Sequence, residues 1–294
     1  NNIARMEADL TPSLFSRNTG YEETQEDQGA NGKFQAFFIE SNSNGKKLAV
    51  DVETLLIGCN GISSVAILRA CESKQKKMTL LGSIVVPAAP PSEMKANSPS
   101  TANNSCQLYL VEDKTRICVA TSNSTLPMDC AFELAQVLFR HIRPKRVVVL
   151  DTITTDKPEA ELNELSSLCI IESTSSLQVK WDEKKYSALA PPYIVQGTAA
   201  AILGHCEVHG MVARLYVAFE DMHRTLKTCI SFEQVLSSSI LDLLPKKEME
   251  ASLETKRLRY MDTASRIGFQ PRGKKVQGSS LLTELAPPPD GLFM

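Results

Sequence analysis

Short apolar runs alternate along the chain with segments whose apolar residues recur at helical spacing. The run 55–57 ends in the Gly/Asn turn 58–61, and a helix-period segment follows behind a serine cap. Two later runs, 146–150 and 212–219, are apolar without alternation, which is typical of buried strands. The pattern therefore predicts a strand, tight turn and helix around residue 58, and two buried strands farther along.

The remaining pattern predicts strands over 83–86, 107–111 and 116–121, the last two forming a hairpin, and helices over 129–142, 198–209, 229–244 and 246–269. In the last helix, one apolar face is marked by Met249, Leu253, Leu258, Met261 and Ile267. Alternating strands and helices favour an α/β fold with a largely parallel sheet and one antiparallel hairpin.

Composition changes along the chain in a way that predicts its organisation. Residues 1–33 are polar without periodic apolar residues, so we expect a mostly disordered arm. Residues 34–245 form the α/β domain, with a flexible Pro/Ser/Asn-rich loop at 88–105. Residues 246–294 are expected to form a charged helix, a linker and a flexible C-terminal tail.

Charge and cysteine usage narrow the class of protein. Among 294 residues, 32 Lys+Arg and 34 Asp+Glu leave a net charge of -2, so no basic excess points to nucleic acid. The apolar runs are far shorter than the roughly 20 residues that span a bilayer, so no membrane association is expected. The eight cysteines stand singly, without a C-x-x-C pair, which favours the cytoplasm, the nucleus or both.

The turn Gly58-Cys59-Asn60-Gly61 is the first candidate for chemistry. A strand end followed by a helix is where α/β folds bind phosphate, but neither G-x-G-x-x-G nor G-x-x-x-x-G-K-[ST] spacing is present. A tight turn is the favoured interpretation. Asp151 also ends a predicted strand, where active-site carboxylates and simple turn caps both occur. No histidine is selected by its spacing as a catalytic partner, so we predict no catalytic residues.

His205 and His209 are spaced to share one face of a helix, which can hold a metal. The pair lacks the H-E-x-x-H pattern and a third ligand. Histidines near the carbonyl end of a helix, just before Gly210, are the favoured interpretation. We therefore predict no metal and no cofactor.

The last three residues, Leu292, Phe293 and Met294, are apolar and follow the three prolines at 287–289. Chain ends are normally polar and frayed, whereas prolines hold a segment extended and reduce the entropy lost when it binds. These residues are predicted to form a docking tail, with Phe293 in an apolar slot and the carboxylate of Met294 on a lysine.

Two stretches carry a resemblance to a known family. Residues 56–62 with the helix behind them, and residues 193–208 continuing through 213–217, 220–222 and 231–236, resemble the family of proteasome assembly chaperones 1 and 2. The resemblance covers roughly residues 50 to 245. In that family the tail motif is hydrophobic-Tyr-any, and here Phe293 stands in place of the tyrosine and lacks its hydroxyl.

The resemblance implies a three-layer αβα fold like that of nucleoside phosphorylases, without their catalytic residues. It implies a chaperone that promotes assembly of the proteasome core particle, not an enzyme. The implied partners are proteasome assembly chaperone 2, in a heterodimer, and the proteasome α subunits, with the tail inserted into a pocket between them. Two alternatives stay open: an enzyme of the nucleoside phosphorylase or hydrolase class using Gly58–Gly61 and Asp151, and an adaptor that docks through its C-terminal peptide.

Overall fold

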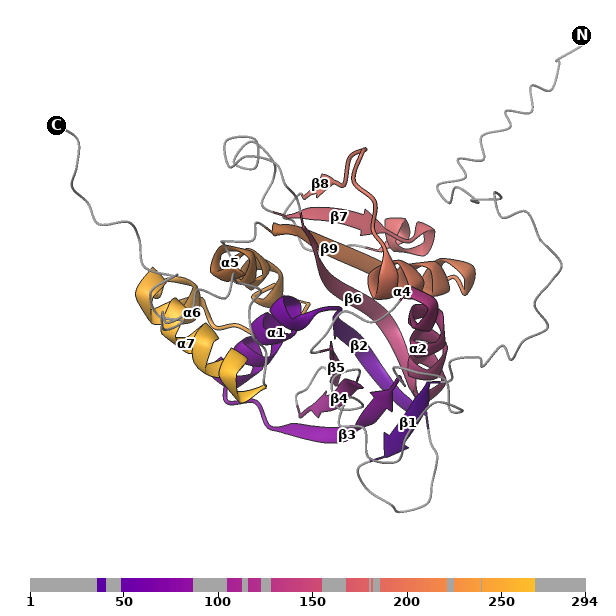
Figure 1. Cartoon of the computed structure of the whole chain (residues 1–294), viewed down its shortest axis with the longest axis horizontal. Coiled ribbons are helices and arrows are strands. Elements are labelled where there is room, and N and C mark those ends of the chain that lie inside the picture. The colour runs from indigo at the N-terminus through magenta and orange to yellow at the C-terminus, as the bar shows by residue number, and fades with distance from the viewer. Residues whose placement is uncertain are drawn as a thin grey trace, which may run out of the picture. The chain divides into compact units, whose positions relative to one another are not determined.

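The computed structural model (Figure 1) describes most of the chain between residues 36 and 267. The described residues are 36–40, 49–86, 105–112, 116–122, 128–154, 168–179, 181, 186–220, 225–238 and 240–267. The predicted N-terminal arm and tail lie outside them, as does the predicted loop 88–105 except for its last residue, Ser105, which begins a strand.

One nine-stranded sheet runs through the described residues, in the order β1-β3-β4-β5-β2-β6-β9-β7-β8. Its centre is parallel: β2 pairs with β5 and β6, and β6 pairs with β9. The strands are β1 (Phe37–Glu40), β2 (Val50–Gly58), β3 (Met78–Val85), β4 (Ser105–Val111), β5 (Ile117–Ser122), β6 (Ile142–Thr154), β7 (Cys169–Glu172), β8 (Ser187–Ala188) and β9 (Val212–Glu220).

Helices cover both faces of this sheet (Figure 1), which makes a three-layer αβα arrangement. One layer contains α2 (Met128–His141) and α4 (Gly197–Val208). The other contains α1 (Gly61–Ser73), α5 (Thr225–Leu236), α6 (Lys246–Met249) and α7 (Leu253–Arg266), and a short 3-10 helix, η2, spans Thr174–Gln178. Among the described helices, none is long and apolar enough to cross a membrane.

Two cores, one on each face, hold the layers together. The face toward α2 and α4 buries Leu55, Leu138 and Val149. The face toward α1 and α5 buries Leu56 and Phe232. Since successive residues of the central strands point to opposite cores, both faces must be apolar, which explains the runs without alternation.

The fold class predicted from the sequence is confirmed: a mixed sheet between two helical layers. Antiparallel pairing is more extensive than the single predicted hairpin. It joins β1 with β3, β3 with β4, β4 with β5, and β7 with β9, so antiparallel pairs flank the parallel centre on both sides, while the outermost pair β7–β8 is parallel. The short strands β1, β7 and β8 were not predicted, because two to four residues are too few to show a period.

Two helix predictions are wrong in detail. The helix expected over 229–244 ends at Leu236, and Asp242 beyond it takes a positive φ of 44°. The helix expected over 246–269 is two helices, α6 and α7. Its predicted apolar face is wrong in part: Met249 and Ile267 pack against the core, whereas Leu253 is 70% exposed and Leu258 is 55% exposed. The face that α7 buries consists of Lys256, Tyr260, Thr263 and Ala264.

Candidate functional site

Helix α7 is anchored to α5 through a buried ion pair. The Lys256 ammonium pairs with the Glu233 carboxylate of α5 and donates to the Met249 carbonyl at 2.8 Å. The Tyr260 hydroxyl donates to the same carboxylate at 3.1 Å. Burial, with Cys229 and Glu233 adding to it, raises the pKa of Tyr260 well above its usual value, so this hydroxyl stays a donor. The buried charges are therefore paired with each other and hydrogen-bonded.

The end of α7 is anchored to α1. The Thr263 hydroxyl and the Arg266 guanidinium both donate to Glu72 of α1, at 3.1 and 2.7 Å. Glu248 of α6 pairs with Arg69 of α1 at 2.9 Å, and also with Arg259 of α7. The chain thus leaves the described domain, after residue 267, from a helix fixed on two others.

The predicted docking residues Leu292, Phe293 and Met294 lie outside the described residues, so their role stays a prediction. They end the 27 residues, 268–294, that follow α7 in the sequence. The structure describes the end of α7, which precedes this segment in the sequence and is held on α1; we call this end the root of the tail.

A second polar group lies where three parallel strands end. The Asn60 amide donates to Asp151 Oδ1 at 2.8 Å and to Thr152 Oγ1 at 2.9 Å. Thr152 Oγ1 donates in turn to Glu220 at 3.1 Å. These residues come from the ends of β2, β6 and β9, so the fold brings together Asn60 and Asp151, which the sequence had singled out separately.

The carboxyl group of Asp151 has an unusual protonation equilibrium. Burial raises its pKa to about 7, and the nearby Glu220 acts in the same direction. Hydrogen bonds from the Thr152 backbone and from Asn60 oppose this rise. A carboxyl group that titrates near pH 7 is chemically able to give or take a proton, which keeps this group a candidate for catalysis.

The turn 58–61 is explained by packing and capping. A Cβ at Gly58 would lie 2.9 Å from the Ser64 backbone nitrogen, so a side chain has no room there. Asn60 Oδ1 accepts from the Ser63 N–H at 3.0 Å and forms a capping box with Ser63. Because the side chain of Asn60 already occupies this donor of the helix N-terminus, the geometry supports the tight turn over a phosphate loop.

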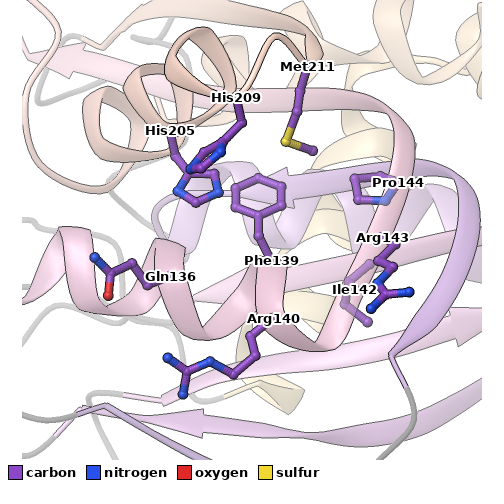
Figure 2. A pocket seen from close by; sticks show the side chains of 9 residues that line it. All are labelled: Gln136, Phe139, Arg140, Ile142, Arg143, Pro144, His205, His209 and Met211. Atoms are coloured by element: carbon purple, nitrogen blue, oxygen red, sulfur yellow. The ribbon is translucent and has the colours of Figure 1, made fainter.

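His205 and His209 form part of an aromatic stack between α2 and α4 (Figure 2). The His205 ring lies 4.5 Å from Phe139 at an interplanar angle of 5°, and 4.2 Å from the His209 ring. Burial, with the neighbouring His209, lowers the pKa of His205. The described residues include no group of three or more His, Cys, Asp or Glu placed to hold a metal. What the structure shows of the two rings is their packing against Phe139 and against each other.

Two features were missed by sequence reasoning. One is the Lys256–Glu233 pair, although Lys256, Tyr260, Thr263 and Ala264 recur at helical spacing and could have indicated the buried face. The other is the exposed pair Arg140 and Arg143 beside the aromatic stack (Figure 2). No sequence signal marks it, because the groove that Arg140, Arg143 and His205 line together forms only through the packing of α2 on α4.

Comparisons with known proteins agree on one family. The family model described as Proteasome assembly chaperone 4 matches residues 39–267, which include every element from β2 to α7. Proteasome assembly chaperone 1 of Danio rerio is 26% identical over 181 residues, 56% of this chain and 64% of that protein. Proteasome assembly chaperone 1 of Nematostella vectensis is 30% identical over 115 residues, 36% of this chain and 43% of that protein. The chain therefore spans less than two thirds of these curated relatives.

The solved structures with a similar fold include two archaeal proteins. The archaeal proteasome activator PbaB of Pyrococcus furiosus has a TM-score of 0.48 and 9% identity, covering 80% of this chain and 98% of that one. PbaA of the same organism, an archaeal homologue of proteasome-assembly chaperone, has a TM-score of 0.45 and 15% identity, covering 79% and 95%. Likeness at this level carries no information on activity or partners.

Proposed function

The chain belongs to the proteasome assembly chaperone family whose model is described as Proteasome assembly chaperone 4, and from this premise we propose that it promotes assembly of the proteasome core particle. The observation that carries the proposal is the family match over residues 39–267, which extends through the anchored helix α7. The two curated relatives are both named Proteasome assembly chaperone 1, in agreement with this assignment.

In detail, the chain acts in the cytoplasm and nucleus as a heterodimer with proteasome assembly chaperone 2, and the pair binds the proteasome α ring. The C-terminal residues Leu292, Phe293 and Met294 insert into a pocket between α subunits. A three-residue tail binds weakly by itself, since burying Phe293 contributes only about 1.5–3 kcal/mol. Tethered to a body that also contacts the ring, it binds at a raised effective concentration, and loss of either contact permits release. The fixed root of the tail on α1 supports this arrangement.

The test is affinity purification of the intact chain from cells, beside a variant lacking residues 292–294, with partners identified by mass. The intact chain should recover α subunits and proteasome assembly chaperone 2. The shortened chain should lose part of the α subunits and keep the second chaperone. Recovery of no proteasome subunit by either chain would overturn the proposal, and a non-proteasomal partner dependent on Phe293 would favour the adaptor.

Single substitutions sharpen this test. Phe293→Ala should behave like the shortened chain, whereas Phe293→Tyr restores the phenol hydroxyl of the family motif and should retain at least the original recovery. The matched control is Phe132→Ala, which removes a phenyl ring that is 64% exposed on α2. It should leave the recovery of both partners unchanged, and a loss equal to that of Phe293→Ala would remove the tail from the mechanism.

A second candidate rests on Asp151, whose raised pKa of about 7 and contact with Asn60 suit an enzyme of the nucleoside phosphorylase or hydrolase class. Turnover of nucleosides or esters by the purified chain, abolished in Asp151→Asn, would support it. Absence of turnover in the intact chain would assign the Asn60–Asp151 hydrogen bond a structural role, which is to connect the start of α1 to β6.

A further inference from the structure

A groove lies between the ends of α2 and α4 and the beginning of β6 (Figure 2). Its volume is about 570 Å³, and its lining includes Phe139, Arg140, Arg143, His205, His209 and Met211. We call this the α2–α4 groove. It is separate from the strand-end group around Asp151, which comes from the opposite ends of the parallel strands.

The middle of the groove is apolar and aromatic. Phe139 and His205 stack with their rings nearly parallel, and Met211 lies beside them (Figure 2). Phe139, His205 and Met211 are all only half-buried, so each leaves apolar surface uncovered. Such a surface suits an aromatic or aliphatic side chain of a ligand.

Two arginines beside this surface have no partner among the described residues. Arg140 and Arg143 are both exposed, and neither side chain forms an ion pair or hydrogen bond there. By contrast, other arginines of the described chain each pair with a carboxylate: Arg69, Arg146, Arg214, Arg257, Arg259 and Arg266. Arg116, exposed just before β5, also lacks a partner there. No acidic residue is among those that line the groove.

Helix dipoles account for part of this arrangement. Arg140 and His205 stand in the last turns of α2 and α4, where a positive charge complements the carbonyl ends. Arg143 lies in β6, so the dipoles do not explain it. The same carbonyl ends disfavour a small anion held at the helix termini. A carboxylate on a longer side chain can bind the exposed guanidinium groups at a distance from these carbonyl ends.

We propose that the α2–α4 groove binds an acidic peptide segment of a partner protein, with an apolar side chain on Phe139 and Met211 and carboxylates on Arg140 and Arg143. Arginine forms two parallel hydrogen bonds with a carboxylate, which gives both charge and orientation. A nucleic acid fits less well, because two arginines neutralise few phosphates and the whole chain carries a net charge of -2. The proposal rests on the groove alone and not on the tail or on the proteasome.

The experiment measures fluorescence anisotropy of the full-length chain with the labelled peptide Glu-Glu-Phe-Glu-Glu. Comparison probes are Lys-Lys-Phe-Lys-Lys, Glu-Glu-Gly-Glu-Glu and a ten-nucleotide oligothymidine. The acidic aromatic peptide should bind most tightly, and replacing its phenylalanine by glycine should weaken binding about fivefold or more. Tighter binding of the basic peptide or of the oligonucleotide would overturn the proposal, as would no binding of the acidic aromatic peptide at millimolar concentration.

Charge reversal in the chain completes the test. The double variant Arg140→Glu with Arg143→Glu should weaken binding of the acidic aromatic peptide about tenfold or more. The matched control is Arg116→Glu, which reverses the unpartnered arginine before β5 and should change binding less than about twofold. Equal losses in both variants would show attraction to overall charge and would contradict a site in the groove. Thermal unfolding of each variant confirms that the comparison is made on folded chains.

Discussion

The two helical layers of this molecule use their charged residues in opposite ways. In the layer of α1, α5, α6 and α7, charged groups meet one another, as in the Lys256–Glu233 pair and the Glu72–Arg266 pair. In the other layer, α2 and α4 meet through apolar side chains and stacked rings, and Arg140 of α2 and Arg143 at the adjoining start of β6 have no partners among the described residues. The first layer uses its charges to hold the end of α7 on α1, whereas the second has exposed guanidinium groups at its edge without a partner among the described residues.

The contrast between the layers is tested most strongly at the buried Lys256–Glu233 pair, where we expect the largest effect on the free energy of unfolding. Lys256→Met removes the ammonium and leaves the Glu233 carboxylate buried, with the Tyr260 hydroxyl as its remaining side-chain partner among the described residues. We expect a loss of about 3–5 kcal/mol in the free energy of unfolding, since an uncompensated buried charge is costly. Urea-induced unfolding at pH 7 measures it.

The matched control removes both charges together. Lys256→Met with Glu233→Gln leaves neither charge of this pair, and the amide oxygen introduced at position 233 would still accept from the Tyr260 hydroxyl. At least half of the lost stability should return. A single variant that loses less than about 1 kcal/mol would mean that the first layer does not depend on its charges.

The same pair shows why sequence reasoning placed the wrong face of α7 inside. A search for large apolar residues selects Leu253 and Leu258, yet both are exposed. The buried face has a lysine and a threonine, which are acceptable only because Glu233 and Glu72 lie opposite them on neighbouring helices. Those partners are 23 and 191 residues away, so the local spacing of residues 256, 260, 263 and 264 can indicate a shared face but not the partners that allow it to be buried.

The central fold was predictable because its signal is local and strong. The runs that became β2, β6 and β9 are apolar without alternation, and the Gly/Asn turn with a serine behind it marked the start of α1. The Asn60–Asp151 contact was only partly predictable: the sequence placed Asn60 just after one strand and Asp151 at the end of another, whereas β6 continues to Thr154 in the structure. The hydrogen bond of 2.8 Å from Asn60 Nδ2 to Asp151 Oδ1 depends on the register of β2 with β6, which the sequence does not show.

Asp151 allows a pH test of the strand-end group. Its pKa of about 7 lies above the ordinary value of 3.8, so the folded state holds a proton that the unfolded state releases. The stability from this group is complete below about pH 4 and is lost as the pH rises through 7. Asp151→Asn should therefore be more stable than the intact chain at pH 8, by roughly 1–3 kcal/mol, and differ little at pH 4.

Urea unfolding at pH 4, 6 and 8 checks this prediction. The control is Asp51→Asn, which neutralises an exposed aspartate at the other end of the parallel strands, in β2. The change in the free energy of unfolding caused by Asp51→Asn should not rise between pH 4 and pH 8 as that of Asp151→Asn does. If Asp151→Asn gains nothing at pH 8, the ionised carboxylate is already accommodated, and the strand-end group holds a stable charge.

A smaller effect is expected where the tail root meets α1. Glu72→Gln keeps an oxygen for Thr263 but loses the charge that pairs with Arg266 at 2.7 Å. The expected loss is about 0.5–1 kcal/mol, together with faster hydrogen exchange in the last turn of α7. Glu254→Gln serves as control, because Glu254 is mostly exposed and lies 3.4 Å from Arg257. Equal exchange in both variants would show that Glu72 does not fix the end of α7.

The smallest effect on the free energy of unfolding is expected in the α2–α4 groove. It tests whether Arg143 contributes to the stability of the fold. Arg143→Gln removes a guanidinium without a partner among the described residues, so the free energy of unfolding should stay within about 0.5 kcal/mol. Arg146→Gln, on the same strand, removes a guanidinium that lies 3.6 Å from the Glu53 carboxylate, and should lower the free energy of unfolding by more. If Arg143→Gln is instead the more destabilising of the two, Arg143 stabilises the fold, and the contrast between the layers fails. If it is neutral, and the acidic peptide still loses affinity for the variant, Arg143 serves the partner and not the fold.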